Sequence, residues 1–455
     1  MSVSEPAALP IPIADLAEAR ARLTRRRGFE EPDLSPRMRA GVRRVFGADL
    51  TAIEVVDRIV GNVRDEGDAA VLRYAAAFDH AEAPLEVPRE SWRVALARLP
   101  SDLRSAMTVA AERIEAFHRK QLRTSWLEWD ADGALGQLVR PLERVGIYTP
   151  GGAAVYPSSL LMTVIPARVA GVGEIIVCSP PGPDGEISPL ILAAAEIAGV
   201  SRMFRIGGAQ AIAAMAYGTE SVPHVDKIYG PGNIFVVLAK RRVYGQVAID
   251  QLPGPTETLL IADEHANPVL VAADLLAQAE HDPMASSILL TTSGVLADAV
   301  LAQIPEQLKN LERADIIAQS LAANGVIAIV PDVATAIDLA NDYAPEHLCL
   351  LVRDPWAAMP LVRHAGGVFV GEDSPEALAD YVTGPSHVMP TGGAARFFSP
   401  INIGDFTKVI SIAAANRAAL RRLAPAAIAL AHAEGLSAHA AALERRVRPE
   451  RGDET

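Results

Sequence analysis

An apolar, helix-like segment of the sequence ends in a glutamine and a histidine that lie one turn apart. Ala, Leu and Val fill most positions from Val269 onward, and the segment closes with "LLAQAEHDP", which contains Gln278 and His281. At 3.6 residues per turn, Asp274, Gln278 and His281 share one face. A buried face would hardly carry three polar groups without partners, because desolvating an unpaired polar group is costly. A solvent-exposed face explains the pattern equally well, so this segment alone leaves both interpretations open.

A second pair of candidate groups stands in "NDYAPEHLCLL", where Glu346 and His347 follow Pro345 at the start of a predicted strand. Adjacent residues on a regular strand point to opposite faces. The two can therefore serve one site only where the backbone is irregular, which Pro345 makes reasonable. A carboxylate beside an imidazole suits general acid–base chemistry. An isolated Glu-His pair is more often a pair of exposed residues with no catalytic role.

A third candidate segment is "ADYVTGPSHVMPT", in which Asp380 and His387 flank a Gly-Pro turn. Six of the ten histidines lie at His281 or beyond, which mildly favours a metal or acid–base site. Glutamine alone is a poor metal ligand. Together with His281 and a carboxylate such as Asp380, however, the carbonyl oxygen of Gln278 could complete a nitrogen and oxygen site suited to zinc.

Strands that alternate with helices must position these residues. One series of β-rich runs is "RVGIY", "EIIVCSP", "RMFRIGG" and "KIYGPG", and a second is "TLLIAD", "SSILLTTS", "GVIAIVP", "HLCLLV" and "GGVFVG". This alternation predicts βαβ units and parallel sheets. Two α/β domains joined near "IDQLPGPTE" are the simplest account. The helix that carries Gln278 is expected to begin with Asn267 as N-cap and Pro268 at its first position.

The remaining segments are predicted to be helical. Residues 1–140 place apolar side chains at near-helical spacing. The strand signal fades after Tyr381, and the Ala-rich end from Ile410 is predicted to form helices that need a surface to pack against.

Two glycine-rich strand exits are candidate ligand sites. In "RIGGAQAIAAM" the chain passes through Gly207 and Gly208, with Gln210 in the first helical turn, and in "IYGPGN" a strand ends at Gly230 with Asn233 behind it. Open α/β sheets bind ligands at such exits. No G-x-G-x-x-G motif follows a strand, and each exit taken singly is more readily explained as a tight turn.

Length, charge and cysteine content narrow the class of protein. The chain has 455 residues, half of them apolar, which exceeds one ordinary domain and supports a large core. Its 42 basic and 55 acidic residues give a net charge of −13, which argues against nucleic acid as a partner. The two cysteines, Cys178 and Cys349, are predicted to be small core residues. Without a signal-like or membrane-spanning segment, a cytoplasmic protein is expected.

Five strings of the sequence occur in the same order in histidinol dehydrogenases, a family that the chain resembles from about Arg27 to His439. The strings are "GGAQAIAAMAYGTESVPHVDKIYGPGN", "LLAQAEHD", "APEHL", "DYVTGPSHVMPT" and "EGLSAH". Any one of them could arise by chance, but five in order argue strongly for the family.

The resemblance implies an NAD-using oxidoreductase of histidine biosynthesis with one zinc ion per subunit. Such enzymes oxidise L-histidinol to L-histidine through L-histidinal. The catalytic pair would be Glu346 and His347. The zinc ligands would be Gln278, His281, Asp380 and His439. Substrate contacts would fall on these ligands and on Thr256, His347, His387 and Glu434, and NAD contacts on Tyr148, Gln210 and Asn233.

The resemblance also implies an α/β fold of two incomplete Rossmann-like domains, with a helical N-terminal region and a helical C-terminal tail. We expect an N-terminal helical arm over residues 1–28. A first domain of residues 29–140 and 256–380 would carry the zinc and catalytic residues, and residues 141–255 would carry the NAD contacts. Residues 381–455 would form a dimerisation tail that completes the partner's site in a homodimer.

Two positions that bear on the substrate depart from the family pattern. Thr256 stands where many members have serine, and Ser386 stands where asparagine is frequent. Some relatives that oxidise other small polar alcohols, which include a sulfonated propanediol, share "GPTE", whereas Glu434 and His439 favour histidinol. A zinc hydrolase, in which Glu346 activates metal-bound water, is a rival. A catalytically inert relative is the weakest alternative, because none of the implied zinc ligands is lost.

Overall fold

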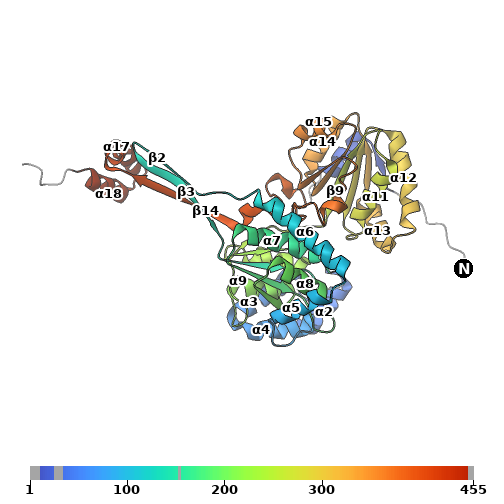
Figure 1. Cartoon of the computed structure of the whole chain (residues 1–455), viewed down its shortest axis with the longest axis horizontal. Helices are drawn as coiled ribbons and strands as arrows, with labels where there is room; N and C mark the ends of the chain where they lie inside the picture. Colours follow the sequence, from blue (N-terminus) through green and yellow to red (C-terminus); the bar gives the residue numbers. More distant parts are fainter. Residues whose placement is uncertain (1–10, 25–33, 152–154, 449–455) are drawn as a thin grey trace, which may run out of the picture. The chain divides into compact units, whose positions relative to one another are not determined.

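The computed structural model describes residues 11–24, 34–151 and 155–448, and the chain divides into two units. Unit 1 comprises residues 1–121 and 142–406, and unit 2 comprises residues 122–141 and 407–455. Unit 1 contains two parallel sheets that are covered by helices, and unit 2 contains a small antiparallel sheet (Figure 1). The parallel sheets confirm the predicted mixed α/β class.

The first sheet of unit 1 has five parallel strands in the order β6-β5-β4-β7-β8. The strands are β4 (Arg144–Tyr148), β5 (Glu174–Ser179), β6 (Arg202–Arg205), β7 (Lys227–Tyr229) and β8 (Ala248–Ile249). The connecting helices are α7 (Pro157–Ala170), α8 (Pro189–Ala198), α9 (Gly208–Tyr217) and α10 (Ile234–Val243). The βαβ alternation is the one that the sequence predicts.

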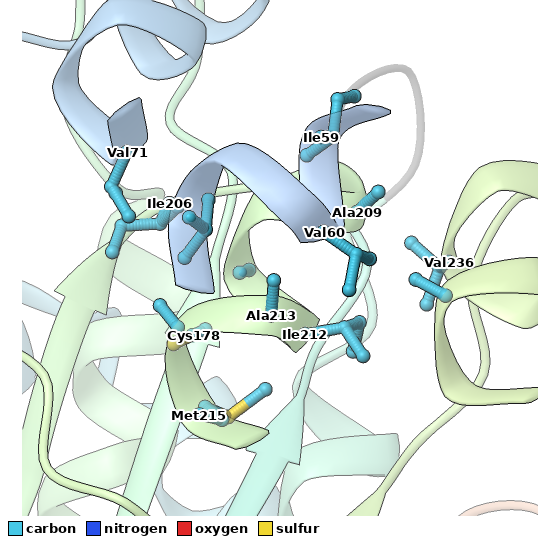
Figure 2. Close-up of a cluster of buried hydrophobic side chains, with 14 of the residues drawn as sticks. Ile59, Val60, Val71, Cys178, Ile206, Ala209, Ile212, Ala213, Met215 and Val236 are labelled. Atoms are coloured by element: carbon cyan, nitrogen blue, oxygen red, sulfur yellow. The ribbon is translucent and has the colours of Figure 1, made fainter. Parts of the chain in front are cut away.

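Alternate residues of each strand face two separate cores. Ile176 and Cys178 of β5 face one buried cluster, and Ile175 and Val177 face the other. The first cluster includes Val60 of α3 and apolar residues of α9 and α10, several of which Figure 2 shows. Near-continuous apolar runs are expected when both faces of a parallel sheet are covered.

Helices from the first 121 residues complete these two cores. They are α2 (Pro36–Phe46), α3 (Ala52–Glu66), α4 (Asp68–Tyr74), the π-helix η1 (Ala75–Asp79), α5 (Arg89–Arg98) and α6 (Ser101–Arg119). Helix α3 starts at a capping box of Thr51 and Glu54, and it packs against α9 and α10. Helices α5 and α6 pack against α8 and α7. This differs from the expected grouping of residues 29–140 with 256–380, because the apolar faces of these helices are buried on the five-stranded sheet.

The second sheet of unit 1 has six parallel strands in the order β1-β11-β10-β9-β12-β13. The strands are β1 (Ile13–Ala14), β9 (Glu257–Ala262), β10 (Ser286–Thr291), β11 (Val326–Ile329), β12 (His347–Leu351) and β13 (Gly367–Val370). The helices are α1 (Leu16–Leu23), α11 (Pro268–Ala279), α12 (Gly294–Leu308), α13 (Ala314–Asn324), α14 (Val333–Tyr343), α15 (Pro355–Ala358) and α16 (Glu376–Ala379). Three 3₁₀ turns complete unit 1: η2 (Met359–Leu361), η3 (Ala394–Arg396) and η4 (Ile403–Phe406).

Local sequence signals set the ends of several of these elements. Asn267 caps α11 by accepting a hydrogen bond from the Val269 N–H, and Pro268 occupies the first helical position, as predicted. The expected helical arm over residues 1–28 is instead partly a strand. Residues Ile13–Ala14 form β1, which pairs with β11, and α1 packs on α14.

Unit 2 is built around three antiparallel strands in the order β14-β3-β2. Its elements are β2 (Trp126–Asp130), β3 (Gly133–Pro141), β14 (Thr407–Ala415), α17 (Arg417–Ala433) and α18 (Ser437–Val447). The prediction of helix across residues 1–140 is therefore wrong at β2 and β3, and the prediction of helix from Ile410 is wrong at β14. Alanine favours helices, but residues 410–415 pair along β3. Of the expected tail, residues 381–406 belong to unit 1.

Among the described residues, no helix combines the length and apolar character needed to cross a membrane.

A buried ion pair orders the turn that follows β7. Lys240 of α10 is fully buried and pairs with Asp250. The Lys240 ammonium also donates to the Gly230 carbonyl (2.9 Å), and Asp250 accepts from the Gly230 N–H (2.7 Å). Gly230 has φ +111°, and a Cβ atom there would lie 2.0 Å from the Tyr148 carbonyl oxygen. The Lys240–Asp250 pair thus binds both the N–H and the carbonyl of Gly230, a position that requires glycine.

We predict that Lys240→Met lowers the free energy of unfolding by about 3–5 kcal/mol, because it leaves the Asp250 carboxylate buried without a counter-charge. Arg242→Met is the matched control on the same helix, since Arg242 pairs with Asp57 where both side chains are half exposed. It should cost at most about 1 kcal/mol. Denaturant unfolding of the two variants measures the difference, and equal losses would contradict the role of the buried pair.

Candidate active site

One groove in unit 1 is lined by the ends of both parallel sheets. The candidate residues that line it are Tyr148, Gln210, Asn233, Thr256, His281, Glu346, His347, Asp380 and His387. Tyr148 ends β4, and the glycine-rich turns follow β6 and β7, so the five-stranded sheet contributes the carboxyl ends of its strands. Thr256 and Glu346 precede β9 and β12, so the six-stranded sheet contributes the amino ends. Residues from both strand series thus meet in one place.

Glu346 and His347 lie on the same groove because the backbone before β12 is irregular. Ala344 ends α14 with φ +56°, a left-handed conformation that is uncommon outside glycine, and Pro345 follows it. Glu346 accepts from the Thr256 hydroxyl (2.6 Å) and from the Glu257 N–H (3.1 Å). His347 places Nδ1 3.0 Å from the Glu257 carbonyl oxygen. The irregularity that the sequence suggested at Pro345 is present.

The imidazole of His347 is held in one tautomer. A carbonyl oxygen only accepts, so the contact with Glu257 requires the proton on Nδ1. Nε2 is then an acceptor, and it is buried without a hydrogen-bond partner among the described residues. A buried, unpartnered acceptor at the edge of a groove is suited to taking a proton from a bound ligand.

Gln278 is fully buried behind the groove, with both ends of its amide engaged. Its nitrogen faces Glu376 Oε1 (2.5 Å), and its oxygen faces Thr256 Oγ1 (2.6 Å) and the Glu257 nitrogen (2.8 Å). The reverse orientation would set acceptor against acceptor and donor against donor. Thr256 has one hydroxyl proton for two acceptors, Glu346 and Gln278, so the hydroxyl links the two side chains.

The side chains of His281 and Asp380 have atoms in the groove that are available to bind a metal. Neither the His281 ring nor the Asp380 carboxylate makes a hydrogen bond within the described ranges, although both line the groove. Burial lowers the pKa of His281, and the Asp380 carboxylate opposes that shift. A neutral imidazole and a free carboxylate are ligand types that zinc accepts.

His387 and Asp380 are joined through the backbone. His387 Nδ1 donates to the Asp380 carbonyl oxygen (2.7 Å), which leaves Nε2 to accept from the Ser159 hydroxyl (3.0 Å). Sequence reasoning did not find Ser159, which lies 228 residues away from His387 along the chain.

The three expected cofactor residues lie at the glycine-rich end of the groove. The Tyr148 hydroxyl accepts from the Gly208 N–H (3.1 Å), and Asn233 caps α10 by accepting from the Phe235 N–H (3.0 Å). Gln210 donates to Asp79 (2.9 Å), which also accepts from the Gly207 N–H (2.9 Å). Asp79 was not found from the sequence. Burial raises its pKa, and the two hydrogen bonds from Gly207 and Gln210 oppose the shift.

Comparison with known proteins identifies the family. The model of the histidinol dehydrogenase family matches residues 44–447. The chain belongs to the histidinol dehydrogenase family.

Relatives of that name cover almost the whole chain. The histidinol dehydrogenase of Deinococcus radiodurans is 53% identical over 435 residues, covering 95% of this chain and 99% of its own. That of Thermus thermophilus is 52% identical over 404 residues, covering 89% and 97%. The crystal structure of histidinol dehydrogenase from Elizabethkingia anophelis has a TM-score of 0.87 at 34% identity and covers 96% of each chain. This chain is therefore an oxidoreductase, as the resemblance implied.

Two residues that the resemblance with histidinol dehydrogenases implies lie in unit 2. Glu434 follows α17 and His439 lies on α18, and both side chains are exposed. Among the described residues, no three His, Cys, Asp or Glu side chains form a group that could hold a metal ion. That His439 binds the same zinc ion as Gln278, His281 and Asp380 stays a prediction.

The cysteines of this family member are core residues, as predicted. Cys178 and Cys349 are buried, and burial raises the pKa of both thiols. A thiol that stays protonated is a poor nucleophile, so neither is suited to forming a covalent intermediate with an aldehyde.

Burial raises the pKa of Glu346 to about 7, against the opposing effects of His347, Thr256 and the Glu257 N–H. A carboxyl group whose pKa is higher in the folded state than in the unfolded state loses its stabilising effect as pH rises. We predict that metal-free protein loses up to about 3 kcal/mol from this group between pH 4.5 and 7. Glu346→Gln should remove that part of the slope.

Denaturant unfolding from pH 5 to pH 8 measures this slope. Glu312→Gln, at an exposed position, controls for the loss of one carboxylate elsewhere in unit 1. A slope for Glu346→Gln that matches wild type would mean that Glu346 is not the group responsible.

Proposed function

We propose that this chain oxidises L-histidinol to L-histidine through L-histidinal, with NAD as hydride acceptor and zinc as a bound cofactor. The observation that carries the proposal is the acid–base cluster of Glu346 and His347, which shares one groove with the glycine-rich turns of the other sheet. Membership of the histidinol dehydrogenase family supplies the substrate.

His347 would be the base in the first oxidation. The alcohol loses a hydride from carbon and a proton from oxygen, and Nε2 of His347 is an available acceptor for that proton. The Glu257 carbonyl holds the ring while it changes charge. NAD, when bound, supplies the carbon that takes the hydride, and we assign its contacts to Tyr148, Gln210 and Asn233.

Glu346 would act mainly in the second oxidation. The aldehyde must add water before a second hydride can leave, and a carboxylate with a pKa near 7 can take a proton from that water at neutral pH. The Thr256 hydroxyl and the Glu257 N–H hold the carboxylate in place. The product is the carboxylate of histidine. The first oxidation releases one proton, and the second, which consumes a water molecule and forms a carboxylate, releases two.

The residues fit zinc in chemistry. Gln278, His281 and Asp380 would hold it from unit 1, with His439 as the fourth ligand. The Gln278 oxygen can release the Thr256 hydroxyl, because that hydroxyl has Glu346 as an alternative acceptor at the same 2.6 Å. Bound zinc would act as a template that grips the imidazole and amine of the substrate. Thr256, His347, His387 and Glu434 are the further substrate contacts that we propose.

The division of labour between the sheets is also part of the proposal. The five-stranded sheet, with residues 141–255, would bind the cofactor, and the six-stranded sheet, with residues 256–380, would carry the catalytic and zinc groups. Unit 2, which carries Glu434 and His439, would complete the active site of the partner chain in a homodimer.

The composition of unit 2 supports a homodimer. Its buried residues in the described ranges are Gly133, Ala134, Gly136, Ala419, Ala424, Ala431 and Ala440. Most of its large apolar side chains are exposed, including Trp129 (74%), Leu135 (62%) and Leu430 (65%). A unit that buries only glycine and alanine lacks a core of its own, and exposed apolar surface of this kind marks an interaction site.

The proposed function predicts that purified protein with zinc reduces NAD when L-histidinol is added, with two equivalents of NADH for each histidine formed. Absorbance of NADH and product analysis measure this, against a panel of other amino alcohols and diols. Glu346→Gln should impair oxidation of supplied L-histidinal more than oxidation of the alcohol. Turnover of a diol alone would favour the relatives that oxidise other alcohols, and ester or amide cleavage without NAD would favour a zinc hydrolase.

The shared site predicts complementation between two inactive variants. His347→Asn and His439→Ala proteins, mixed under conditions of subunit exchange, should recover activity towards half of wild type per heterodimer. One site of the mixed dimer carries both lesions and the other carries neither. His432→Ala, an exposed histidine of the same unit, is the matched control and should retain activity alone. Verified exchange without recovery would show that each chain builds its own site.

A further inference from the structure

A carboxylate that sequence reasoning did not single out lies behind the groove, beside Gln278 and His347. Glu376 is the first residue of α16 and is only 7% exposed. Within the described part of the chain it pairs with no Lys or Arg, and its ionic neighbour is His347. Burial raises the pKa of Glu376, and the nearby Asp380 and Asp274 carboxylates raise it further. Burying such a group without a cation is costly unless other contacts offset the loss of water.

One oxygen of Glu376 meets two nitrogen donors of the site. Oε1 lies 2.5 Å from the Gln278 amide nitrogen and 3.3 Å from His347 Nδ1. The first contact fixes which way the Gln278 oxygen points. The second is an ion-pair contact beside the hydrogen bond from Nδ1 to the Glu257 carbonyl, which lies at 3.0 Å. A carboxylate suits this place because it accepts a hydrogen bond from the Gln278 amide and its negative charge favours the Nδ1–H tautomer of His347.

We propose that Glu376 is a positioning residue of the active site, which orients the Gln278 oxygen for its metal and holds His347 with Nε2 facing the groove. The inference rests on the proposed function for the roles of Gln278 and His347. Groups that orient metal ligands and catalytic histidines in this way typically change metal affinity or activity by 10- to 100-fold when removed.

The alternative is that Glu376 serves only the packing of α16. The two roles give opposite expectations for Glu376→Leu. Leucine has similar bulk and no charge, and replacing a buried charged group by an apolar one is often neutral or stabilising. A packing role therefore predicts that zinc affinity is kept whenever the fold is kept. A positioning role predicts that zinc affinity falls although the fold is kept.

The test compares Glu376→Leu, Glu376→Gln and wild type in three measurements. Thermal unfolding of metal-free protein should change little in either variant. Zinc affinity, measured by competition with a chromophoric chelator, should fall about 10- to 100-fold in Glu376→Leu. Glu376→Gln should retain most of it, because the amide oxygen still accepts from Gln278. Nitrogen NMR of the His347 ring, assigned with His347→Asn, should show Nδ1–H in wild type and a mixed tautomer in Glu376→Leu.

Asp373→Asn is the matched control, because Asp373 is exposed in the loop that leads to α16. It should match wild type in all three measurements. Wild-type zinc affinity and tautomer in folded Glu376→Leu would overturn the inference, as would losses that simply follow a fall in thermal stability. None of these measurements needs histidinol turnover. Failure of the function assay would therefore leave them standing, and their failure would leave histidinol oxidation standing.

Discussion

Two buried carboxylates that have no lysine or arginine partner constrain the whole groove. Glu346 and Glu376 are both 7% exposed, and within the described ranges neither pairs with Lys or Arg. Their lost hydration must be offset by hydroxyl, amide, imidazole and backbone N–H donors. Those donors come from Thr256, Glu257, Gln278 and His347, which fixes how the starts of β9 and β12 and the end of α11 meet. The contacts that offset the cost of burying these carboxylates also hold Glu346 and His347 at the groove.

The groove uses opposite ends of its two sheets. Ligands of open α/β sheets ordinarily bind at the carboxyl ends of strands, and the turns after β6 and β7, to which we assign the cofactor, lie at such ends. In the six-stranded sheet, the proposed catalytic residue Glu346 and its partner Thr256 precede β12 and β9, at the amino ends. At the amino end of β9, the Glu257 N–H donates to both Glu346 and Gln278. The buried carboxylate of Glu346 therefore depends on a backbone N–H donor at the amino end of the six-stranded sheet.

Sequence reasoning located the groups whose position is set within a short segment. Pro345 with Glu346 and His347, the Asn267 cap of the Gln278 helix, and the Gly230 turn each carry their own geometric signal. Residues whose partners are remote had no such signal. Asp79 meets Gly207 across 128 residues, and Ser159 meets His387 across 228. Glu376 sits in a four-residue helix that is too short to show a period. The place of α3 was missed for the same reason, because amphipathicity shows that a helix packs but not on which sheet.

Unit 2 explains why the strands β2, β3 and β14 escaped prediction and why the chain would need a partner. Most of their large apolar side chains are exposed and their buried positions are glycine and alanine, so the alternation of large buried residues with surface residues that identifies a strand is absent. Such a unit gains little stability from its own packing and must gain it from another surface. The exposed Glu434 and His439 belong to that unit, whereas the buried carboxylates belong to unit 1. If the site joins the two across chains, as proposed, then the energy that assembles the dimer also completes the catalytic groove, and activity follows protomer concentration.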